Sequence, residues 1–410
     1  MGKADGPLAG VRVLEMGRLV AAPYCGQILA DLGADVIKVE RVGSGDDVRG
    51  YGPPFLNGSD GAGSASVYYL AFNRNKRSIA IDFAKPEGAE LVRRLAAHCD
   101  VLIENYKVGS LKKYGLDADG IHAVNPDMVY LSVSGFGQDG PYAHRPATDV
   151  VIQGMSGFMS INGAPDGPPY RAGIPVMDMV TGLYCSTAVV SALYARGKGG
   201  GGAFTWPKVA LLDAGIAAMN PALVTHELTG QPLLRNGNDG QGSSPSGLFS
   251  CKDGEILVQA GKDADFAKLC RVLGREELIA DERFAGRVRR VENHAEIMAI
   301  VGAEIASRGR IELYEALVET GIICGPVNRI DQALEDPQVL SNNIRQPAGH
   351  PQSASLHLAG SPIRYGQGID PIRLPPPGLG QHSAEILREL LAMEDVERDS
   401  LVERGVVQLG

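Results

Sequence analysis

The sequence predicts an α/β protein with a doubly wound parallel sheet in a large domain and with a second, smaller domain. Short apolar runs alternate with segments of helical spacing in the first third of the chain, and strands that alternate with helices pair in parallel. The runs that predict strands are residues 11–15, 35–40, 78–83, 100–105 and 128–135. Ligands bind beyond the carboxyl ends of such strands, so we expect the functional site in the loops that follow these runs.

The segments between the predicted strands have helical patterns. In 17–34 the apolar residues recur at the spacing of one helix face. The segment 85–99 begins with Lys-Pro-Glu, and proline and glutamate suit the first turn of a helix. Residues 179–195 hold no charge, which predicts a helix buried on most of its faces, with Asp178 in its first turn.

The middle of the chain has a different composition. The glycine-rich segment 235–247 precedes a strand-like run and several amphipathic helical patterns, which predicts a small α+β domain over residues 225–330. The tail, 331–410, again combines strand and helix patterns, so we expect it to rejoin the large domain of residues 1–205.

The overall composition is that of a globular protein with an acidic balance. Lys and Arg number 39 against 48 Asp and Glu, and the formal net charge of -9 argues against general nucleic-acid binding. Six scattered cysteines and a start without an apolar leader predict reduced thiols in a cytoplasmic protein. The uncharged run is short for a membrane span, so we expect no membrane partner. The eight histidines show no paired spacing, and we expect no metal site.

Asp178 has two compatible interpretations. An aspartate at a helix start commonly accepts backbone N–H bonds as an N-cap, and position alone favours this interpretation. A helix N-terminus also stabilises an ionised carboxylate, which covalent catalysis uses as a nucleophile.

Two further stretches have open interpretations. Arg74, Lys76, Arg77 and Lys85 surround a predicted strand and form either a solvated charge run or a phosphate-binding patch. The segment 235–247 lacks the P-loop pattern, and both a mobile lid and a plain surface loop fit it. The loop after the first predicted strand lacks the glycine fingerprint of nicotinamide-dinucleotide sites.

Seven stretches, taken together and in order, resemble the class III CoA-transferase family. This family includes formyl-CoA:oxalate and carnitine CoA-transferases and is related to α-methylacyl-CoA racemase. The stretches are PLAGVRVLEMGRLVAAPYCGQILADLGADVIKVER, GSGDDVRGYGPPF, NRNKRSIAIDFAKPEG, VLIENYKVGSLKKYGLD, VSGFGQDGPY, PPYRAGIPVMDMVTGLY and PPPGLGQHSAEIL. The resemblance implies a Rossmann-like large domain built from both chain ends, a small central domain, and a homodimer of two chains interlocked like rings.

The resemblance also implies that Asp178 is the nucleophile. Its carboxylate accepts the acyl group of a CoA thioester as a mixed anhydride and then carries CoA as an aspartyl thioester, with no permanently bound cofactor. Because anhydrides hydrolyse, water must be excluded. Gly237, Gly240 and Gly242 match the glycine loop of the family, and we expect them to form a lid.

Further positions are implied to bind CoA. Arg18 to Ala21 match the segment beside the thioester and the pantetheine arm, and the other positions match the surroundings of the nucleotide. The complete CoA-binding set is Arg18, Leu19, Val20, Ala21, Arg41, Ile81, Lys85, Asn105, Tyr106 and Lys113. Val20 stands where formyl-CoA transferase has a glutamine, so backbone N–H groups would have to stabilise charge there.

The acceptor is implied by Arg235 and the PPPGLGQH stretch, which resemble members that use succinyl-CoA and accept dicarboxylates. A second carboxylate in a buried site pairs most naturally with arginine, and the candidates are Arg18, Arg49 and Arg171.

Two other functions stay open. Racemisation needs two proton-transferring groups. The racemase branch has a His-Asp pair where this chain has Thr148 and Asp149, and a threonine cannot act as a base near neutral pH. A non-catalytic acyl-CoA-binding protein would use Asp178 only as a helix cap.

Overall fold

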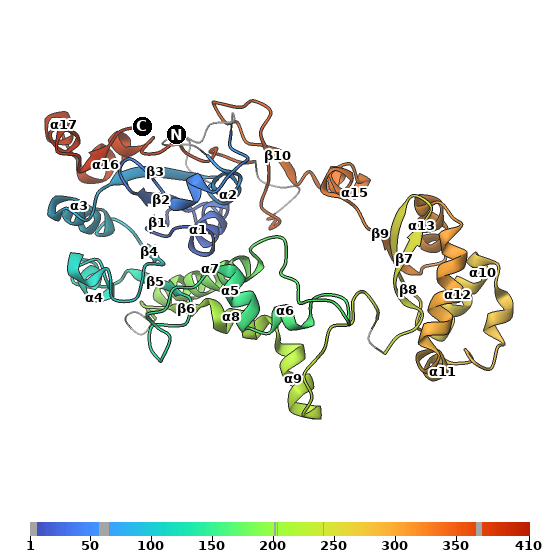
Figure 1. The fold of residues 1–410 in the computed structure, drawn as a ribbon. Coiled ribbons are helices and arrows are strands. Elements are labelled where there is room, and N and C mark those ends of the chain that lie inside the picture. Colours follow the sequence, from blue (N-terminus) through green and yellow to red (C-terminus); the bar gives the residue numbers. More distant parts are fainter. Residues whose placement is uncertain (1–5, 57–64, 201, 203, 241, 366–370) are drawn as a thin grey trace. The chain divides into compact units, whose positions relative to one another are not determined.

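The computed structural model describes residues 6–56, 65–200, 202, 204–240, 242–365 and 371–410 (Figure 1). The chain forms two compact units. The large unit comprises Met1–Phe158, Arg171–Gln231 and Gln338–Gly410, and the small unit comprises Met159–Tyr170 and Pro232–Pro337.

These units differ from the expected segments 1–205, 225–330 and 331–410 mainly at 159–170, which belongs to the small unit. The reason is local pairing. The N–H of Gly237 donates to the carbonyl of Gly163 (3.0 Å), and the guanidinium of Arg235 donates to the carbonyl of Ala164 (3.2 Å).

The large unit is built on a seven-stranded sheet with the strand order β12-β3-β2-β1-β4-β5-β6. Neighbouring strands are parallel except for β12, which pairs antiparallel with β3. The strands are β1 (Arg12–Glu15), β2 (Asp35–Glu40), β3 (Lys76–Ile81), β4 (Val101–Glu104), β5 (Val129–Ser134), β6 (Lys208–Ala210) and β12 (Val407–Gln408). The five predicted strands correspond to β1 to β5, and a large parallel sheet is confirmed.

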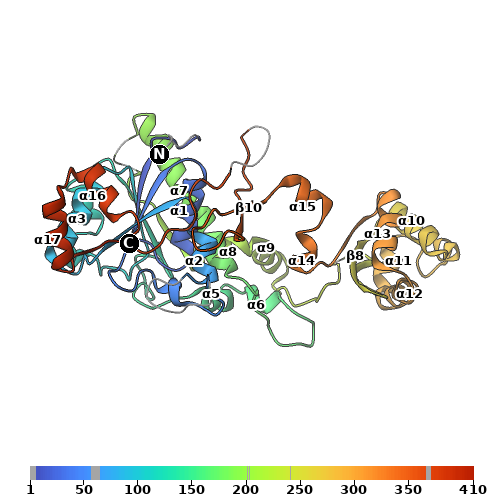
Figure 2. The same ribbon diagram turned by 90° about the horizontal axis from the view of Figure 1, so that it is seen from above.

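Both faces of this sheet are buried because successive side chains of a strand point to opposite faces. Val13 and Leu14 of β1 belong to two different hydrophobic cores, as do Val36 and Ile37 of β2. One core includes residues of α3 (Pro86–Ala96), α16 (Ser383–Leu391) and α17 (Asp395–Glu403), which Figure 2 shows gathered on one side of the large unit. The other core includes residues of α1 (Ala21–Asp31), α7 (Val176–Gly197) and α8 (Leu211–Ala218).

Shorter elements connect the strands of the large unit. They are η1 (Asp47–Gly50), α2 (Val67–Phe72), η3 (Lys112–Tyr114), α4 (Ala118–His122), α5 (Asp149–Met155), α9 (Asn220–Thr229), α15 (Pro337–Asn342), β10 (Arg345–Pro347) and β11 (His357–Ala359). Helix α6 (Phe158–Ile161) begins at the last residue before the chain enters the small unit. The C-terminal residues return to this unit, because β12 extends the sheet at β3 and α16 and α17 pack on its core.

The small unit combines an antiparallel three-stranded sheet with helices. Its strands are β7 (Ser246–Cys251), β8 (Gly254–Gln259) and β9 (Ile323–Pro326). Its helices are α10 (Asp263–Leu273), η4 (Glu276–Ile279), α11 (Arg287–Glu292), α12 (His294–Ala306), α13 (Arg310–Glu319) and α14 (Ile330–Ala333). Its core contains Phe249 and Ile256 of the sheet with Phe266, Val301 and Leu317 of the helices.

Helix α7 differs from the expectation that most of its faces are buried. One stripe, including Cys185 and Val189, is fully buried, whereas Leu183, Tyr184 and Tyr194 are 51%, 48% and 68% exposed. Among the described residues it is the one helix long and apolar enough to cross a membrane by length and composition. The uncharged sequence gives α7 no charged face, but the rest of this chain covers only one side of the helix.

Candidate active site

The candidate site lies at the carboxyl ends of the strands, at the point where the order of the strands in the sheet reverses direction. β1 lies between β2 and β4, so the loops after β1 and β4 diverge and leave a crevice at this point. Two cavities open here, one of about 300 Å³ that contains Asp178 and one of about 330 Å³ that contains Arg41. We call them the Asp178 cavity and the Arg41 cavity. Residues 17–21, which follow β1, contribute to the walls of both.

The loop after β1 is held by two side chains from elsewhere in the chain. The Asn105 amide accepts a hydrogen bond from the N–H of Arg18 (2.9 Å) and donates one to its carbonyl (2.7 Å). A carboxylate oxygen of Asp46 accepts the N–H of Leu19 (3.1 Å). Leu19 has a φ of 66°, a left-handed conformation that leucine rarely adopts, so these bonds stabilise a strained loop beside the cavity.

A buried charge network lies beneath this loop. The Lys38 ammonium contacts Glu15 (2.9 Å) and Asp46 (2.9 Å) and donates to the carbonyl of Gly17 (2.8 Å). Lys76 pairs with Glu15 at 2.8 Å, and burial lowers the pKa of this lysine to about 8. Each charge therefore has a partner, as burial of ions requires.

The basic stretch around β3 is neither a solvated run nor a phosphate patch. Arg74 pairs with Asp31, Arg77 pairs with Asp35, and Lys76 is wholly buried. Each of these basic residues fixes a neighbouring element to the sheet. Lys85, predicted to bind CoA, donates instead to the carbonyls of Arg404 (2.6 Å) and Gly405 (3.0 Å).

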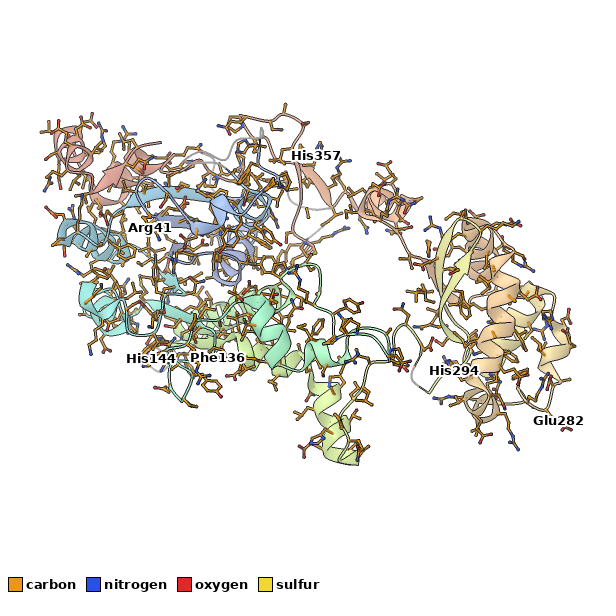
Figure 3. All side chains as sticks on the ribbon, viewed as in Figure 1. Arg41, Phe136, His144, Glu282, His294 and His357 are labelled. Atoms are coloured by element: carbon orange, nitrogen blue, oxygen red, sulfur yellow. The ribbon has the colours of Figure 1, made fainter. Side chains whose placement is uncertain are left out.

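The Arg41 cavity brings together five of the predicted CoA-binding residues: Arg18, Arg41, Ile81, Tyr106 and Lys113. Arg41 directly follows β2 and is labelled in Figure 3. The Arg18 guanidinium lies 4.6 Å from the ring centre of Tyr106 and pairs with Asp47 at 2.8 Å. The cations Arg18, Arg41 and Lys113 lie beside apolar and aromatic walls, a combination that suits a ligand with phosphates and a flat ring. Lys38 and the acids Glu40, Asp46 and Asp82 also line this cavity.

Asp178 is the third residue of α7 and its carboxyl group lines the other cavity. The interpretation of Asp178 as the N-cap is wrong, because the helix begins one residue after Pro175. One oxygen of Asp149 accepts the N–H groups of Met177 (2.7 Å) and Asp178 (3.1 Å). Asp149 thus supplies from α5 the carboxylate that a cap would provide.

The environment of Asp178 opposes its ionisation. Burial, and after it the negative charge of Asp149, raises the pKa of Asp178 to about 7. The carboxyl group is therefore poised between its neutral and its ionised form near physiological pH, which is characteristic of functional carboxyl groups.

The three candidate arginines for an acceptor carboxylate lie in different places. Arg171 lines the Asp178 cavity and is exposed. Arg18 lines the Arg41 cavity. Arg49 reaches neither of these two cavities: it is buried in an ion pair with Glu40 at 2.7 Å and donates to the Pro377 carbonyl. The structure therefore gives Arg49 a structural role in place of the expected contact with an acceptor.

The glycines predicted to form a lid belong to the small unit. Gly237 and Gly242 have φ values of 59° and 64°, which favour glycine. Gly240 donates its N–H to the carbonyl of Ser246 (2.8 Å). Within the same unit His294, labelled in Figure 3, contacts Ser244 (3.0 Å) and Asp239, so side chains of the small unit anchor this segment. Closure over a substrate stays a prediction.

The sequence interpretation missed Tyr51, Tyr68 and Gln153, and it considered Asp149 only at the position of the racemase His-Asp pair. Tyr51 and Tyr68 line the Asp178 cavity, and Asp149 and Gln153 contact the chain around Asp178. A signal for the last two was present, because an acid and an amide four residues apart lie on one face of a helix.

Comparison with known proteins shows the family. The sequence profile described as CoA-transferase family III matches residues 8–383. A protein of Agrobacterium fabrum named succinate–glutarate CoA-transferase is 40% identical, with 95% of this chain and 96% of the relative covered. A Mus musculus protein named succinyl-CoA:glutarate CoA-transferase is 36% identical, with coverages of 98% and 90%.

The fold is likewise similar to a solved structure. The structure of a CaiB/BaiF family protein from Brucella suis has a TM-score of 0.85 and 38% sequence identity, and the similarity covers 94% of this chain and 100% of that one. From the extent of these matches, the chain belongs to the CoA-transferase family III.

Proposed function

We propose that this CoA-transferase moves CoA from succinyl-CoA to a dicarboxylic acid of about the size of glutarate. The observation that carries the proposal is that Asp178 and Arg171 line one cavity beside residues 19–21. The names of the two relatives above pair succinate or succinyl-CoA with glutarate, which supports this choice of substrates.

The proposed reaction proceeds through the Asp178 carboxylate. It attacks the thioester carbonyl of succinyl-CoA, the carbon–sulfur bond breaks, and a mixed anhydride and CoA thiolate form. The thiolate attacks the aspartyl carbonyl and releases succinate, which leaves CoA on Asp178 as a thioester. The acceptor carboxylate attacks this thioester, and the thiolate that leaves then attacks the acceptor carbonyl and frees Asp178. Covalent catalysis thus divides the exchange into steps between activated acyl groups of similar energy.

Backbone groups of α1 suit the oxyanions of these steps. Val20 and Ala21 line the Asp178 cavity, and the N-cap residue Val20 has no side-chain hydrogen bond to the first turn of the helix. The first N–H groups of a helix have no partner inside the helix and carry a partial positive charge. We assign to them the stabilisation of negative charge on the carbonyl oxygens.

The acceptor site needs a cation because the cavity already contains two acids. Asp149 and Asp178 would repel a second carboxylate, and Arg171 is the only cation among the described residues that line this cavity. An arginine binds a carboxylate through two parallel hydrogen bonds. We therefore assign the distal carboxylate of the acceptor to Arg171.

The CoA nucleotide is assigned to the Arg41 cavity. Arg18, Arg41 and Lys113 supply positive charge for the phosphates, and Ile81 and Tyr106 supply apolar surface for the adenine. Residues 17–21, which contribute to both cavities, provide a wall along which the pantetheine arm can reach Asp178.

We also propose the expected assembly and location. The uncovered side chains Leu183, Tyr184 and Tyr194 of α7 support a homodimer in which a second copy covers this helix, interlocked as the family resemblance implies. The strand order supports a Rossmann-like class for the large unit. The six unpaired cysteines support a reducing, cytoplasmic location.

The alternatives are less well supported by the cavity. No histidine occurs among the described residues that line the Asp178 cavity, and Thr148 stands beside Asp149, so the second proton-transferring group of a racemase has no counterpart there. A pure binding protein would have no need to keep a carboxyl group at a pKa near 7 in this cavity.

The test is a transfer assay with succinyl-CoA and a panel of free mono- and dicarboxylic acids, read by chromatography of the acyl-CoA products. The wild type should form a new acyl-CoA with glutarate, and Asp178→Ala should form none while still binding CoA. Equal product formation by both proteins would refute the role of Asp178, and no product from any acid would favour the binding protein.

A further inference from the structure

Helix α5 contacts the chain before Asp178 at two points. Its residue Asp149 accepts the N–H groups of Met177 and Asp178, at 2.7 and 3.1 Å. One turn later, the amide oxygen of Gln153 accepts the N–H of Ala172 (2.8 Å). The first contact lies at the nucleophile, and the second lies next to Arg171.

The two α5 side chains are also joined to each other. The Gln153 amide nitrogen donates to the second carboxylate oxygen of Asp149 at 2.5 Å. Asp149 is 7% exposed and Gln153 is fully buried. All three oxygens that the two side chains offer are used, and the amide of Gln153 is oriented by an acceptor on one side and a donor on the other.

The segment between the two contacts has little else to hold it. Residues 171–175 form no helix or strand, and the side chain of Ile174 is 59% exposed. A Cβ atom placed on Gly173 would meet nothing within 4 Å. The hydrogen bonds from α5 therefore tie both ends of the segment between Arg171 and the first turn of α7 to the large unit.

We propose that Asp149 and Gln153 are positioning residues that clamp residues 171–178 at both ends, and so fix the separation of the nucleophile and the cation that selects the acceptor. The inference rests on the proposed function, because it takes Arg171 as the site of the distal carboxylate. Its consequence is selectivity for acceptor length, since a displacement of about 1 Å is enough to lower reaction rates strongly.

The same pair places a negative charge beside the nucleophile. The titratable groups that line the cavity with Asp178 are Asp149 on α5, Arg171 before α7, Tyr51 after η1 and Tyr68 on α2. The linings from α1, β5 and α8 are the uncharged residues Val20, Ala21, Val133, Ser134 and Leu211. From α1, the ring of Tyr24 also packs against Gly182, further along α7. Of these groups, Asp149 is the acid whose carboxylate contacts the Asp178 backbone.

A pair of reversed substitutions separates the hydrogen bonds from the charge. In Asp149→Asn alone, the new amide nitrogen faces the Gln153 amide nitrogen, so the link to Gln153 or the link to Ala172 is lost. In Asp149→Asn with Gln153→Glu, the asparagine oxygen still accepts the N–H groups of α7, its nitrogen donates to the new carboxylate, and that carboxylate accepts the N–H of Ala172. All the hydrogen bonds return, while the negative charge moves from position 149 to position 153, one helical turn further from Asp178.

The readouts are the ratio of kcat/KM for glutarate to that for adipate, and the pH dependence of kcat/KM. Gln153→Ala should lower the ratio about fivefold or more. The double variant should restore the ratio, while its acidic limb lies at lower pH than that of the wild type. Ser156→Ala, which removes a buried hydroxyl just after the same helix, is the control and should change neither readout.

The inference would be overturned if Gln153→Ala kept the wild-type ratio, or if the double variant were no more selective than Asp149→Asn. An unchanged acidic limb in a folded, selective double variant would overturn the electrostatic part. If a single variant does not fold, the double variant decides by itself. These outcomes differ from a failure of the proposed function, in which wild-type protein itself would not transfer CoA to glutarate.

Discussion

Replacement of Asp178 by asparagine should stabilise the protein at alkaline pH. The carboxyl group has an ordinary pKa of 3.8 and a pKa of about 7 in the folded chain, raised first by burial and then by Asp149. The folded state therefore holds the proton more tightly than the unfolded state. Ionisation of Asp178 opposes folding, and this opposition is absent well below pH 4, grows between pH 4 and 7, and is complete above pH 7.

The magnitude follows from the difference between the two pKa values. A difference of about three pH units corresponds to roughly 4 kcal/mol. Asp178 keeps part of its surface in the solvent, so screening reduces this value, and we expect about 2 kcal/mol at pH 8. Asparagine has the same shape and no charge, so Asp178→Asn should gain this amount at pH 8 and only about a quarter of it at pH 4.5.

The assay is thermal unfolding of wild type and Asp178→Asn at both pH values, followed by circular dichroism. We expect the variant to unfold a few degrees higher than wild type at pH 8 and higher by only about one degree or less at pH 4.5. Asp139→Asn, at an exposed aspartate, is the control and should change neither midpoint. An equal gain at both pH values, or no gain at pH 8, would refute the electrostatic reasoning.

Four further predictions concern activity and stability. The rate at which succinyl-CoA acylates Asp178 should rise with pH through about 7, because only the ionised carboxylate attacks, and a stopped-flow pH profile with no such limb would contradict this. Arg171→Ala should raise the KM for glutarate about tenfold or more but leave monocarboxylates unaffected, which steady-state kinetics with both acids can check. Arg49→Ala should cost about 3–5 kcal/mol in urea unfolding because the buried Glu40 would lose the guanidinium that pairs with both of its oxygens, while any folded enzyme keeps its KM for the acceptor. Asn105→Ala should raise the KM for succinyl-CoA several-fold because the loop after β1 loses both hydrogen bonds of the amide, and an unchanged KM would show that the loop is held without it.

The sheet could be predicted from the sequence because its signal is local. The apolar runs of β1 and β2 are short, lack polar alternation, and are separated by a helical pattern, and these features are those of strands buried on both faces. The adjacent uncharged run likewise predicts the position of Asp178 in the first turn of α7.

The partners of charged residues could not be predicted because they come from distant positions. The sequence predicts a solvated charge run or a phosphate patch for Lys76 and contact with an acceptor for Arg49, but folding places Glu15 beside Lys76 and Glu40 beside Arg49. Position alone favours Asp178 as the cap of its own helix, whereas the carboxylate that accepts the first N–H groups of α7 comes from Asp149, which lies 29 positions earlier. Only the packing of α5 against the start of α7 brings that carboxylate into place.

The covalent role of Asp178 is tested most directly by trapping the intermediate. Wild type and Asp178→Ala are mixed with succinyl-CoA, quenched in acid within milliseconds to seconds, digested, and analysed by mass spectrometry. We expect a succinyl or CoA adduct on the peptide that contains Asp178, lost when glutarate is added and absent from the variant. Transfer to glutarate that continues in Asp178→Ala, or an adduct found on another residue, would contradict the mechanism.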